Sequence, residues 1–218
     1  SAAYDHFLEQ FGDNGAKNIV MMHRHDIADK IYNQMMQHFS CSNSLLKEEV
    51  IGVSDTNMAN NYSYASKQSI WDKFDSSDEH IKSVLFTGIS KGVFVEAKFD
   101  SVPELAFARV LEQDSDVKNW LRPAKMQFNI TYNRGKRYEP DFVVETEDTI
   151  YLVEVKGEDK LTDPDVIAKK KRGIQYCQVA SNWGKANGYK AWQYLFIPSM
   201  QIKSSSTFSS LSKMFVGK

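Results

Sequence analysis

The chain has 218 residues, of which 42% are hydrophobic, enough for one sizeable core or for a core domain with a smaller appendage. Its 27 Lys and Arg residues nearly balance 28 Asp and Glu residues, so the chain as a whole lacks the excess basicity of many independent nucleic-acid binders. The two cysteines are too few for a disulfide framework and indicate a reducing, cytoplasmic compartment. No apolar run of about eighteen residues and no basic-then-apolar N-terminus occurs, so we expect neither a membrane span nor a signal peptide.

Apolar residues between positions 16 and 39 recur at spacings of three to five, which predicts an amphipathic helix. Residues 52–80 are rich in Ser, Asp and Asn, and this composition predicts a loop or a mobile connection. We therefore expect a mainly helical N-terminal segment over residues 1–80, packed on the next domain or left from a preceding one. Because the first residue is Ser1 rather than Met, we also expect the chain to be a fragment of a longer protein.

Beyond this segment the sequence alternates strand and helix patterns. Short β-branched and aromatic runs predict strands at 83–86 and 93–95, and Ser101 or Asp100 can cap a helix that starts near Pro103. The later elements are predicted as strands at 126–132, 138–146 and 149–156, a basic helix at 163–181, a strand at 192–197 and a short helix within 204–218. This order predicts an α/β fold with a central mixed β-sheet flanked by helices, its core domain at 81–200 and a C-terminal tail or helix at 201–218.

Two acidic residues stand at matching positions of the predicted hairpin. If the hairpin is centred on Glu147 and Asp148, facing residues have numbers that sum to 295, so Asp141 faces Glu154. Directly opposed residues of antiparallel strands have Cβ atoms about 4.5–5.5 Å apart, which lets both carboxylates reach one cation. The period of two along the second strand places Glu154 and Lys156 on the same face.

Opposed carboxylates on a mostly apolar face repel each other, and burying them unpaired is costly. A divalent cation and the ammonium group of Lys156 would compensate them. Such a cation polarises a phosphodiester oxygen and lowers the pKa of a bound water, while a lysine orients that water or stabilises developing charge. The chemistry that fits is phosphodiester hydrolysis. The alternative is an ordinary hairpin, in which Asp141 lies in a turn and Glu154 and Lys156 form a solvated pair.

The residues Pro140-Asp141, a short hairpin and Glu154-Val-Lys156 resemble the motif of the PD-(D/E)XK nuclease superfamily. A wider set of segments resembles the C-terminal nuclease region of type III restriction enzyme Res subunits, over roughly residues 80–200: 98–107, 117–123, 130–132, 138–141 and 154–157. The resemblance implies a restriction-endonuclease-like core that cleaves double-stranded DNA as part of a restriction-modification system. It also implies a catalytic site of Asp141, Glu154 and Lys156, in which the two carboxylates bind Mg²⁺ or Mn²⁺.

Glu104, in the segment Pro103-Glu-Leu-Ala-Phe107, matches the acidic residue that the family supplies from the helix before the sheet. The resemblance therefore implies that Glu104 is a fourth catalytic residue and a metal ligand, direct or through water. The alternative is an ordinary glutamate in the first turn of a helix, where the helix dipole favours negative charge.

The predicted basic helix supplies the remaining candidates. Members of the superfamily place polar or basic residues on the helix that follows the Lys-bearing strand, which implies DNA binding by Lys169, Lys170, Lys171, Arg172 and Gln175. Between positions 156 and 185 there are seven Lys or Arg residues against four acids, and this local excess favours attraction to the DNA backbone. The alternative is a solvated helix face.

The resemblance also implies two protein partners, a modification (methyltransferase) subunit and the helicase portion of the same Res subunit. Because the chain has no Gly-x-x-x-x-Gly-Lys-Ser/Thr loop, ATP would bind only to domains outside it. Two other functions stay open. One is a nuclease-fold module that docks DNA or partner subunits without independent activity, and the other is a repair or recombination nuclease acting on branched or single-stranded DNA.

Overall fold

The computed structural model describes residues 2–38, 50, 62–74, 78–125, 127–132 and 135–217. The chain divides into two compact units, Ser1–Glu48 and Glu49–Lys218. This division lies earlier than the expected domain start at residue 81, because Ile70, eleven residues before that start, is fully buried in the core of the second unit. The described part of 62–80 therefore belongs to the second unit and not to an N-terminal helical segment.

The first unit is helical, as predicted, but its helices differ in extent from the prediction. They are α1 (Ala2–Met22), which Gly12 interrupts with a φ of 69°, and α2 (Arg24–His38). The single helix expected from 16 to 39 is thus two helices separated at His23, and Phe39 lies outside the described residues. Among the helices that the structure describes, none is long and apolar enough to cross a membrane.

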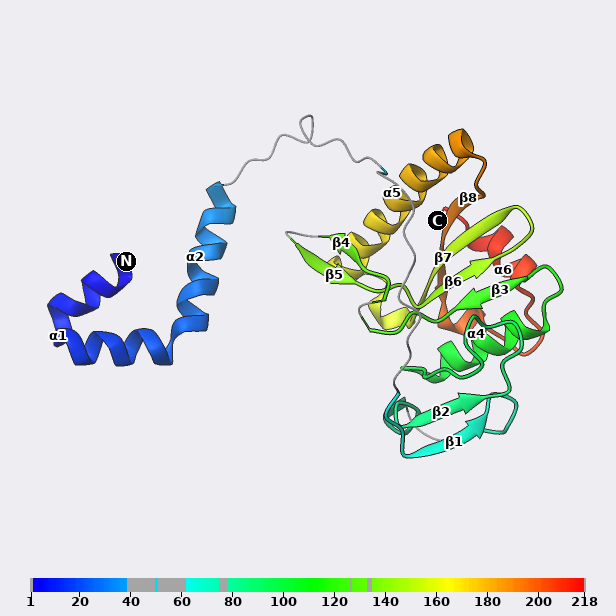
Figure 1. Cartoon of the computed structure of the whole chain (residues 1–218), viewed down its shortest axis with the longest axis horizontal. Helices are drawn as coiled ribbons and strands as arrows, with labels where there is room; N and C mark the ends of the chain where they lie inside the picture. Colours follow the sequence, from blue (N-terminus) through cyan, green and yellow to red (C-terminus); the bar gives the residue numbers. More distant parts are fainter. Residues whose placement is uncertain are drawn as a thin grey trace. The chain divides into compact units, whose positions relative to one another are not determined.

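The second unit is a mixed α/β fold, as predicted, with helices around a four-stranded sheet (Figure 1). Its strands are β1 (Ser66–Ser69), β2 (Val84–Thr87), β3 (Asn119–Leu121), β4 (Ile130–Tyr132), β5 (Lys136–Tyr138), β6 (Phe142–Glu145), β7 (Thr149–Lys156) and β8 (Ala191–Pro198). Its helices are α3 (Asp78–Ile81), α4 (Val102–Gln113), α5 (Pro164–Asn187) and α6 (Phe208–Phe215), with short 3-10 helices at Glu158–Lys160 and Ser199–Gln201.

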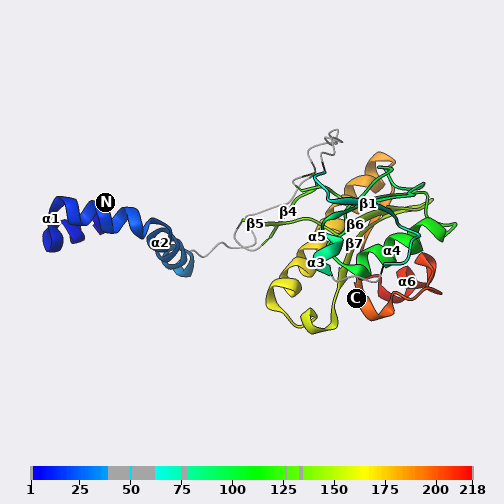
Figure 2. The same cartoon turned by 90° about the horizontal axis from the view of Figure 1, so that it is seen from below.

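The four-stranded sheet has the order β3-β6-β7-β8 and is mixed, because β7 and β8 are parallel while the other neighbours are antiparallel. The predicted register of the β6–β7 hairpin is confirmed: Phe142 pairs with Val153, and Glu145 with Ile150. Two smaller sheets accompany it, a parallel pair of β1 and β2 and an antiparallel hairpin of β4 and β5. In both views the β4–β5 hairpin extends from the body of the unit beside the first half of α5 (Figures 1 and 2).

The two faces of the sheet pack against different helices. Residues of odd and even number alternate between the faces, as strand geometry requires. One face, with Phe142 and Val153, packs in a cluster with apolar residues of α4 and α6. The other face, with Leu152 and Tyr194, packs with Val166 of α5 and with the inner side of the β4–β5 hairpin. Glu154 and Lys156 share the parity of Leu152 and therefore lie on the α5 side.

Some strand predictions were wrong in extent. The stretch 138–146 is divided, because Pro140 has no N–H to donate and separates β5 from β6. The residues 93–95 form bends, with an isolated bridge between Gly92 and Trp120 in place of a strand. Of the stretch 126–132 only β4 is a strand, and Met126 lies outside the described residues. The polar β1 and the short β3 were not predicted, since neither shows an alternating apolar pattern.

Capping residues mark the ends of the longer helices of the second unit. Helix α4 begins after Ser101, whose hydroxyl accepts from the Glu104 N–H, as predicted. Helix α5 begins after Asp163, as predicted, but it ends at Asn187 and not near 181. Gly188, which follows the last helical residue, adopts a φ of 76°. The predicted C-terminal helix is confirmed as α6, which a capping box at Thr207 starts.

Candidate active site

The β6–β7 hairpin brings Asp141, Glu154 and Lys156 together. Asp141 immediately precedes β6, and the register of the hairpin, continued by one residue, sets it opposite Glu154. The position of its carboxylate is fixed because Oδ2 accepts a hydrogen bond of 2.8 Å from the Val155 N–H. Both carboxyl residues are buried, with 8% of Asp141 and 4% of Glu154 exposed. The opposed pair predicted from the sequence is therefore present.

Lys156 lies between the two carboxylates. Its Nζ is 2.8 Å from Glu154 Oε1 and 3.6 Å from Asp141 Oδ2. Burial lowers the pKa of Lys156, but the charges of Asp141 and Glu154 raise it by more, so the net pKa lies above its usual value. The ammonium group therefore stays charged and compensates part of the negative charge of the site.

Glu154 has more negative charge around it than Lys156 compensates. Burial, and then the charge of Asp141, raise the pKa of the Glu154 carboxyl, while Lys156 opposes them. Its Oε2 is buried and accepts no hydrogen bond from any group that the structure describes. A buried carboxylate oxygen without a partner is expensive, so this atom marks a place where a further proton or cation would be stabilising.

The fourth predicted residue, Glu104, joins the same site from the first turn of α4. Its Oε2 accepts from the Asp100 N–H at 3.0 Å, and Ser101 Oγ lies 3.1 Å from its Oε1. Its principal partner is Arg122, whose Nη2 lies 2.7 Å from Oε2. Burial and the charge of Asp141 raise the pKa of Glu104, whereas Arg122 lowers it.

Arg122 is the site residue that the sequence did not single out. It follows β3, and its side chain is only 11% exposed. Besides Glu104, Nη2 contacts Asp100 Oδ2 at 2.7 Å, while Nη1 donates to the Asp141 carbonyl at 3.0 Å and lies 3.9 Å from Asp141 Oδ1. Arg122 thus connects the start of α4 to the start of β6. We call Glu104, Arg122, Asp141, Glu154 and Lys156 the charged cluster.

The position of Arg122 was not predictable because it depends on β3. That strand has only three residues and pairs with β6, which brings the residue after it beside Asp141. One signal was available: a lone arginine directly before Pro123, at the end of an apolar stretch that includes Trp120 and Leu121. Without the strand pairing, nothing in that signal points to Asp141.

The five residues predicted to bind DNA from α5 differ in their exposure and contacts. Lys171 and Gln175 are exposed. Lys169 lies 2.9 Å from Asp165 and over the Tyr132 ring, and its charge lowers the pKa of Glu154. The other two contact neighbouring strands: Lys170 lies over the Phe196 ring of β8, and Arg172 Nε donates to the Thr131 carbonyl of β4 at 2.9 Å.

Two tyrosine hydroxyls lie behind Glu154, on its α5 side. The hydroxyls of Tyr138 and Tyr194 are buried and, like Glu154 Oε2, have no hydrogen-bond partner among the described residues. The rings meet α5 at Gly173, where an added Cβ would lie 2.4 Å from Tyr194 Cε2 and 2.7 Å from the Tyr138 hydroxyl. Burial raises the pKa of both tyrosines, and the charge of Glu154 raises it further, so both remain neutral donors.

Within the charged cluster, Asp141 and Glu154 are the residues that could hold a divalent cation. Carboxylate oxygens are the ligands that Mg²⁺ prefers, and Glu154 Oε2 is a buried oxygen without a partner. No group of three or more His, Cys, Asp and Glu side chains that could hold a metal ion occurs among the described residues. Two protein carboxylates would therefore leave the other positions to water or substrate, as Mg²⁺ sites commonly do. Glu104 is paired with Arg122, and its ligation of a metal stays a prediction.

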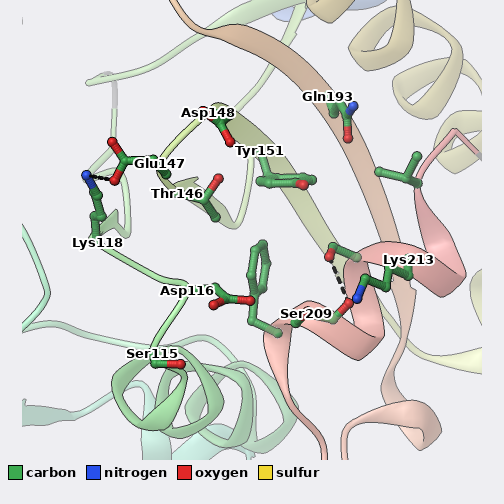
Figure 3. A pocket seen from close by; sticks show the side chains of 13 residues that line it. Ser115, Asp116, Lys118, Thr146, Glu147, Asp148, Tyr151, Gln193, Ser209 and Lys213 are labelled. Atoms are coloured by element: carbon green, nitrogen blue, oxygen red, sulfur yellow. Dashed lines mark hydrogen bonds and ion pairs between the residues drawn. The ribbon is translucent and has the colours of Figure 1, made fainter.

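A pocket of about 590 Å³ lies at the turn end of the β6–β7 hairpin (Figure 3). It is lined by Ser115, Asp116, Lys118, Thr146, Glu147, Asp148, Tyr151, Gln193, Phe208, Ser209, Ser212, Lys213 and Val216. The rings of Tyr151 and Phe208 meet edge to face there, with centroids 5.1 Å apart. Because β7 rises about 3.3 Å per residue, Lys156 lies about 23 Å along the strand from Thr149, which follows the turn. The pocket is therefore separate from the charged cluster.

Comparison of the chain with models of known protein families, with curated proteins and with solved structures found no match. The charged cluster itself, with its partly compensated pair of buried carboxylates, is therefore the feature of the chain from which a function can be argued.

Proposed function

We propose that this chain carries a Mg²⁺-dependent endonuclease site that hydrolyses DNA phosphodiester bonds. The single observation that carries the proposal is the buried pair of Asp141 and Glu154 at opposed positions of a hairpin, with Lys156 between them. This is the residue set of the PD-(D/E)XK motif, and we propose a restriction-endonuclease-like core for the second unit. The wider resemblance extends the proposal to the nuclease region of a type III restriction enzyme Res subunit, which would act with a modification subunit and a helicase portion.

The roles of the residues follow from their positions. Asp141 and Glu154 would hold the cation, which when bound polarises a phosphodiester oxygen and acidifies a bound water. The Val155 N–H keeps the Asp141 carboxylate oriented, which reduces the reorganisation needed when DNA binds. The charged ammonium group of Lys156 would orient the attacking water or stabilise the negative charge that develops on the phosphate.

Glu104 and Arg122 would act through position and charge. Arg122 bonds both Glu104 and the Asp141 carbonyl, so it fixes the start of α4 beside the start of β6. An arginine so placed also supplies positive charge next to the carboxylates. For the same reason it favours a second candidate function, a module of nuclease fold that docks DNA or partner subunits without cutting, because Arg122 already compensates Glu104 and part of Asp141.

Metal binding and strand cleavage, measured on the same proteins, separate the two candidates. Calorimetric titration of Mg²⁺ and Mn²⁺ into the wild type and Asp141→Ala is combined with nicking of supercoiled plasmid. We expect the wild type to bind metal and nick DNA and the variant to do neither. Metal binding without nicking would contradict cleavage by this chain and favour a module that has no activity without its motor and partner domains. Failure to bind metal, even with DNA present, would contradict the endonuclease site and favour the docking module.

A further inference from the structure

Glu154 and two tyrosines behind it carry polar atoms that are buried without a partner. Four side-chain atoms of the described residues are in this situation: Arg122 Nε, Glu154 Oε2 and the hydroxyls of Tyr138 and Tyr194. Buried polar atoms in native proteins are nearly always hydrogen-bonded, so these atoms call for an explanation. An ionised carboxylate oxygen accepts hydrogen bonds, and a neutral tyrosine hydroxyl donates one, so Glu154 and the two tyrosines are complementary.

The sheet places Tyr194 on the same side as Glu154. Strand β8 runs parallel to β7, with Tyr194 paired with Leu152 and Phe196 paired with Glu154. Because side chains alternate between the two faces, Tyr194 and Glu154 share a face and are offset by two residues on neighbouring strands. Strands about 4.8 Å apart that rise about 3.3 Å per residue place such a pair roughly 8 Å apart at Cα. This span is within the combined reach of a tyrosine and a glutamate side chain.

Tyr138 approaches Tyr194 from the end of β5. It packs in the apolar cluster that also contains Leu152 and Tyr194. At Gly173 of α5, the position of an added Cβ lies 2.7 Å from the Tyr138 hydroxyl and 2.4 Å from Tyr194 Cε2. Two atoms this close to one point are neighbours, so the Tyr138 hydroxyl lies beside the Tyr194 ring.

The electrostatics of the two tyrosines points to Glu154. Burial first, and then the charge of Glu154, raise the pKa of both Tyr138 and Tyr194. Asp141, the other carboxylate of the opposed pair, raises the pKa of each tyrosine by less than Glu154 does. Glu154 is therefore the carboxylate that acts most strongly on the two hydroxyls, and both hydroxyls stay protonated and able to donate.

We propose that Tyr138 and Tyr194 are positioning residues whose hydroxyls donate hydrogen bonds to Glu154 Oε2 from the α5 side. The inference rests on the proposed endonuclease function, because it assigns the groups that would hold one of the two metal-binding carboxylates. The terminal torsion of a glutamate side chain is soft, so the carboxylate can turn Oε2 toward the hydroxyls at little cost. A carboxylate has about four lone-pair sites, so bonds from the tyrosines and from Lys156 still leave a site for the cation.

The first test is the affinity of the full chain for Mn²⁺, read from the electron paramagnetic resonance signal of the free ion, so that no cleavage is needed. The variant Tyr138→Phe/Tyr194→Phe keeps both rings and removes both hydroxyls. Hydrogen bonds that orient a metal ligand typically contribute about 10–100-fold to metal affinity. We therefore expect the variant to bind Mn²⁺ at least about tenfold more weakly than the wild type.

Tyr176→Phe is the matched control. Tyr176 is a partly buried tyrosine of α5 that packs against the same apolar cluster, and its ring meets those of Phe128 and Trp192 edge to face. Burial raises the pKa of Tyr176, and Glu154 is not among the charges that act on it. We expect Tyr176→Phe to keep the Mn²⁺ affinity of the wild type.

The second test is the stability of the metal-free chain, measured by urea unfolding in the wild-type and Glu154→Gln backgrounds. If the hydroxyls bond to Glu154, their removal lowers the unfolding midpoint in the wild type, and it does so clearly less where Glu154 has lost its charge. Hydroxyls that only fill space would give the same shift in both backgrounds.

Unchanged Mn²⁺ affinity in Tyr138→Phe/Tyr194→Phe, beside a wild type that binds the ion, would overturn the positioning role. A stability shift that does not depend on Glu154 would overturn it as well. If the wild type binds no Mn²⁺, the endonuclease proposal fails, and the unfolding comparison alone decides on the hydrogen bonds. If the wild type binds Mn²⁺ and nicks plasmid while the tyrosine variant behaves identically, the endonuclease site stands and the positioning role fails.

Discussion

At the scale of single residues, the charged cluster is held together by two cations in different positions. Lys156 lies between Asp141 and Glu154, whereas Arg122 links Glu104 and Asp100 to the start of β6. Breaking a buried ion pair by removing one partner is far more costly than replacing both, because the remaining charge is left without compensation. The stability of the cluster therefore depends on Arg122 as much as on the carboxylates.

Replacing Arg122 with Met is expected to lower the free energy of unfolding by about 3–5 kcal/mol, since Glu104 would stay buried without its partner. The double variant Arg122→Met/Glu104→Gln should recover a large part of this loss. Denaturant unfolding of the wild type, both single variants and the double variant gives the coupling energy. If the double variant were as unstable as the sum of the single variants, the pairing of Arg122 with Glu104 would have no energetic weight.

The sequence predicted the parts of this cluster that depend on one hairpin. The pairing of Asp141 with Glu154 could be predicted from the sequence because a two-residue loop and a period of two fix the register of the hairpin. Arg122 could not be found in the same way, because its place depends on the pairing of β3 with β6, across about twenty residues of chain. The pattern of residues within a segment predicts pairing between neighbouring strands. Contacts between segments that are distant in the sequence can be predicted only when the tertiary fold is known.

Glu112, which lies outside the charged cluster, should make the stability of the protein depend on pH. Its carboxylate accepts from the Ser90 N–H at 2.9 Å, the Ser90 hydroxyl at 2.6 Å, the Lys91 N–H at 2.9 Å and Trp120 Nε1 at 2.7 Å. Burial raises the pKa of Glu112, but these hydrogen bonds lower it by more, so its pKa in the folded protein is below its usual value. The ionised carboxylate therefore stabilises the fold above the unfolded pKa of about 4.3, and this contribution is lost as the pH falls through the folded pKa.

Glu112→Gln is accordingly expected to lower the free energy of unfolding by about 2 kcal/mol at neutral pH, because hydrogen bonds to a charged acceptor are lost. The difference from the wild type should shrink as the pH falls below about 4. Unfolding of both proteins across this pH range measures it, with the exposed Glu79→Gln as a control that should change little. A difference that stays constant with pH would mean that the charge of Glu112 does not contribute.

At the scale of elements, α5 is the helix that closes the site from the side of the tyrosines. Its Gly173 is buried and faces the rings of Tyr138 and Tyr194. A glycine in the middle of a helix normally costs about 1 kcal/mol relative to alanine, so its presence here needs a packing reason. The close approach of Tyr194 Cε2, 2.4 Å from the place of an added Cβ, supplies that reason.

Gly173→Ala should therefore lower stability by about 1–3 kcal/mol, against the trend of helix propensity, because the added methyl group forces the rings of Tyr138 and Tyr194 to move. Thermal or denaturant unfolding measures the effect. Gln175→Ala, on the exposed side of the same helix, should change stability by less than about 0.5 kcal/mol. An alanine at position 173 that stabilised the protein would show that α5 does not approach β8 as closely as described.

The elements themselves were predicted best where two signals agreed. The strands β7 and β8 and the start of α4 combine an apolar pattern with clear boundaries, and their positions were predicted to within one residue. Element β1 has only polar residues, so its strand character comes from pairing with β2 and from the fully buried Ile70 next to it. Pattern analysis alone has no access to that pairing.

At the scale of the whole molecule, the chain consists of a helical first unit and a mixed α/β second unit. The expected boundary near residue 80 missed the division at Glu48, because the polar composition before α3 suggested a linker, while Ile70 in that stretch is buried in the second unit. Both apolar clusters of the second unit are formed by residues after position 69. The second unit thus contains its own core.

A shortened chain that starts at Glu49 is expected to keep the unfolding transition of the second unit, because both described apolar clusters lie within it. Differential scanning calorimetry of the full and shortened chains would compare the transitions. The melting temperature of the α/β unit should agree between them to within a few degrees, on the order of the effect of 1 kcal/mol. Loss of the cooperative transition in the shortened chain would mean that the first unit is needed for folding.

The proposed catalytic role of the buried pair of Asp141 and Glu154 depends on the charge of Glu154. It is tested most directly by the rate of plasmid nicking in Mg²⁺ by the wild type and by Glu154→Gln, which keeps the shape of the side chain but removes its charge. Both proteins are first shown to be folded. We expect the wild type to nick DNA and Glu154→Gln to be slower by about a hundredfold or more, the scale of losing one group that stabilises charge at the reacting phosphate. Equal nicking rates, or no nicking by the wild type with either Mg²⁺ or Mn²⁺, would contradict it.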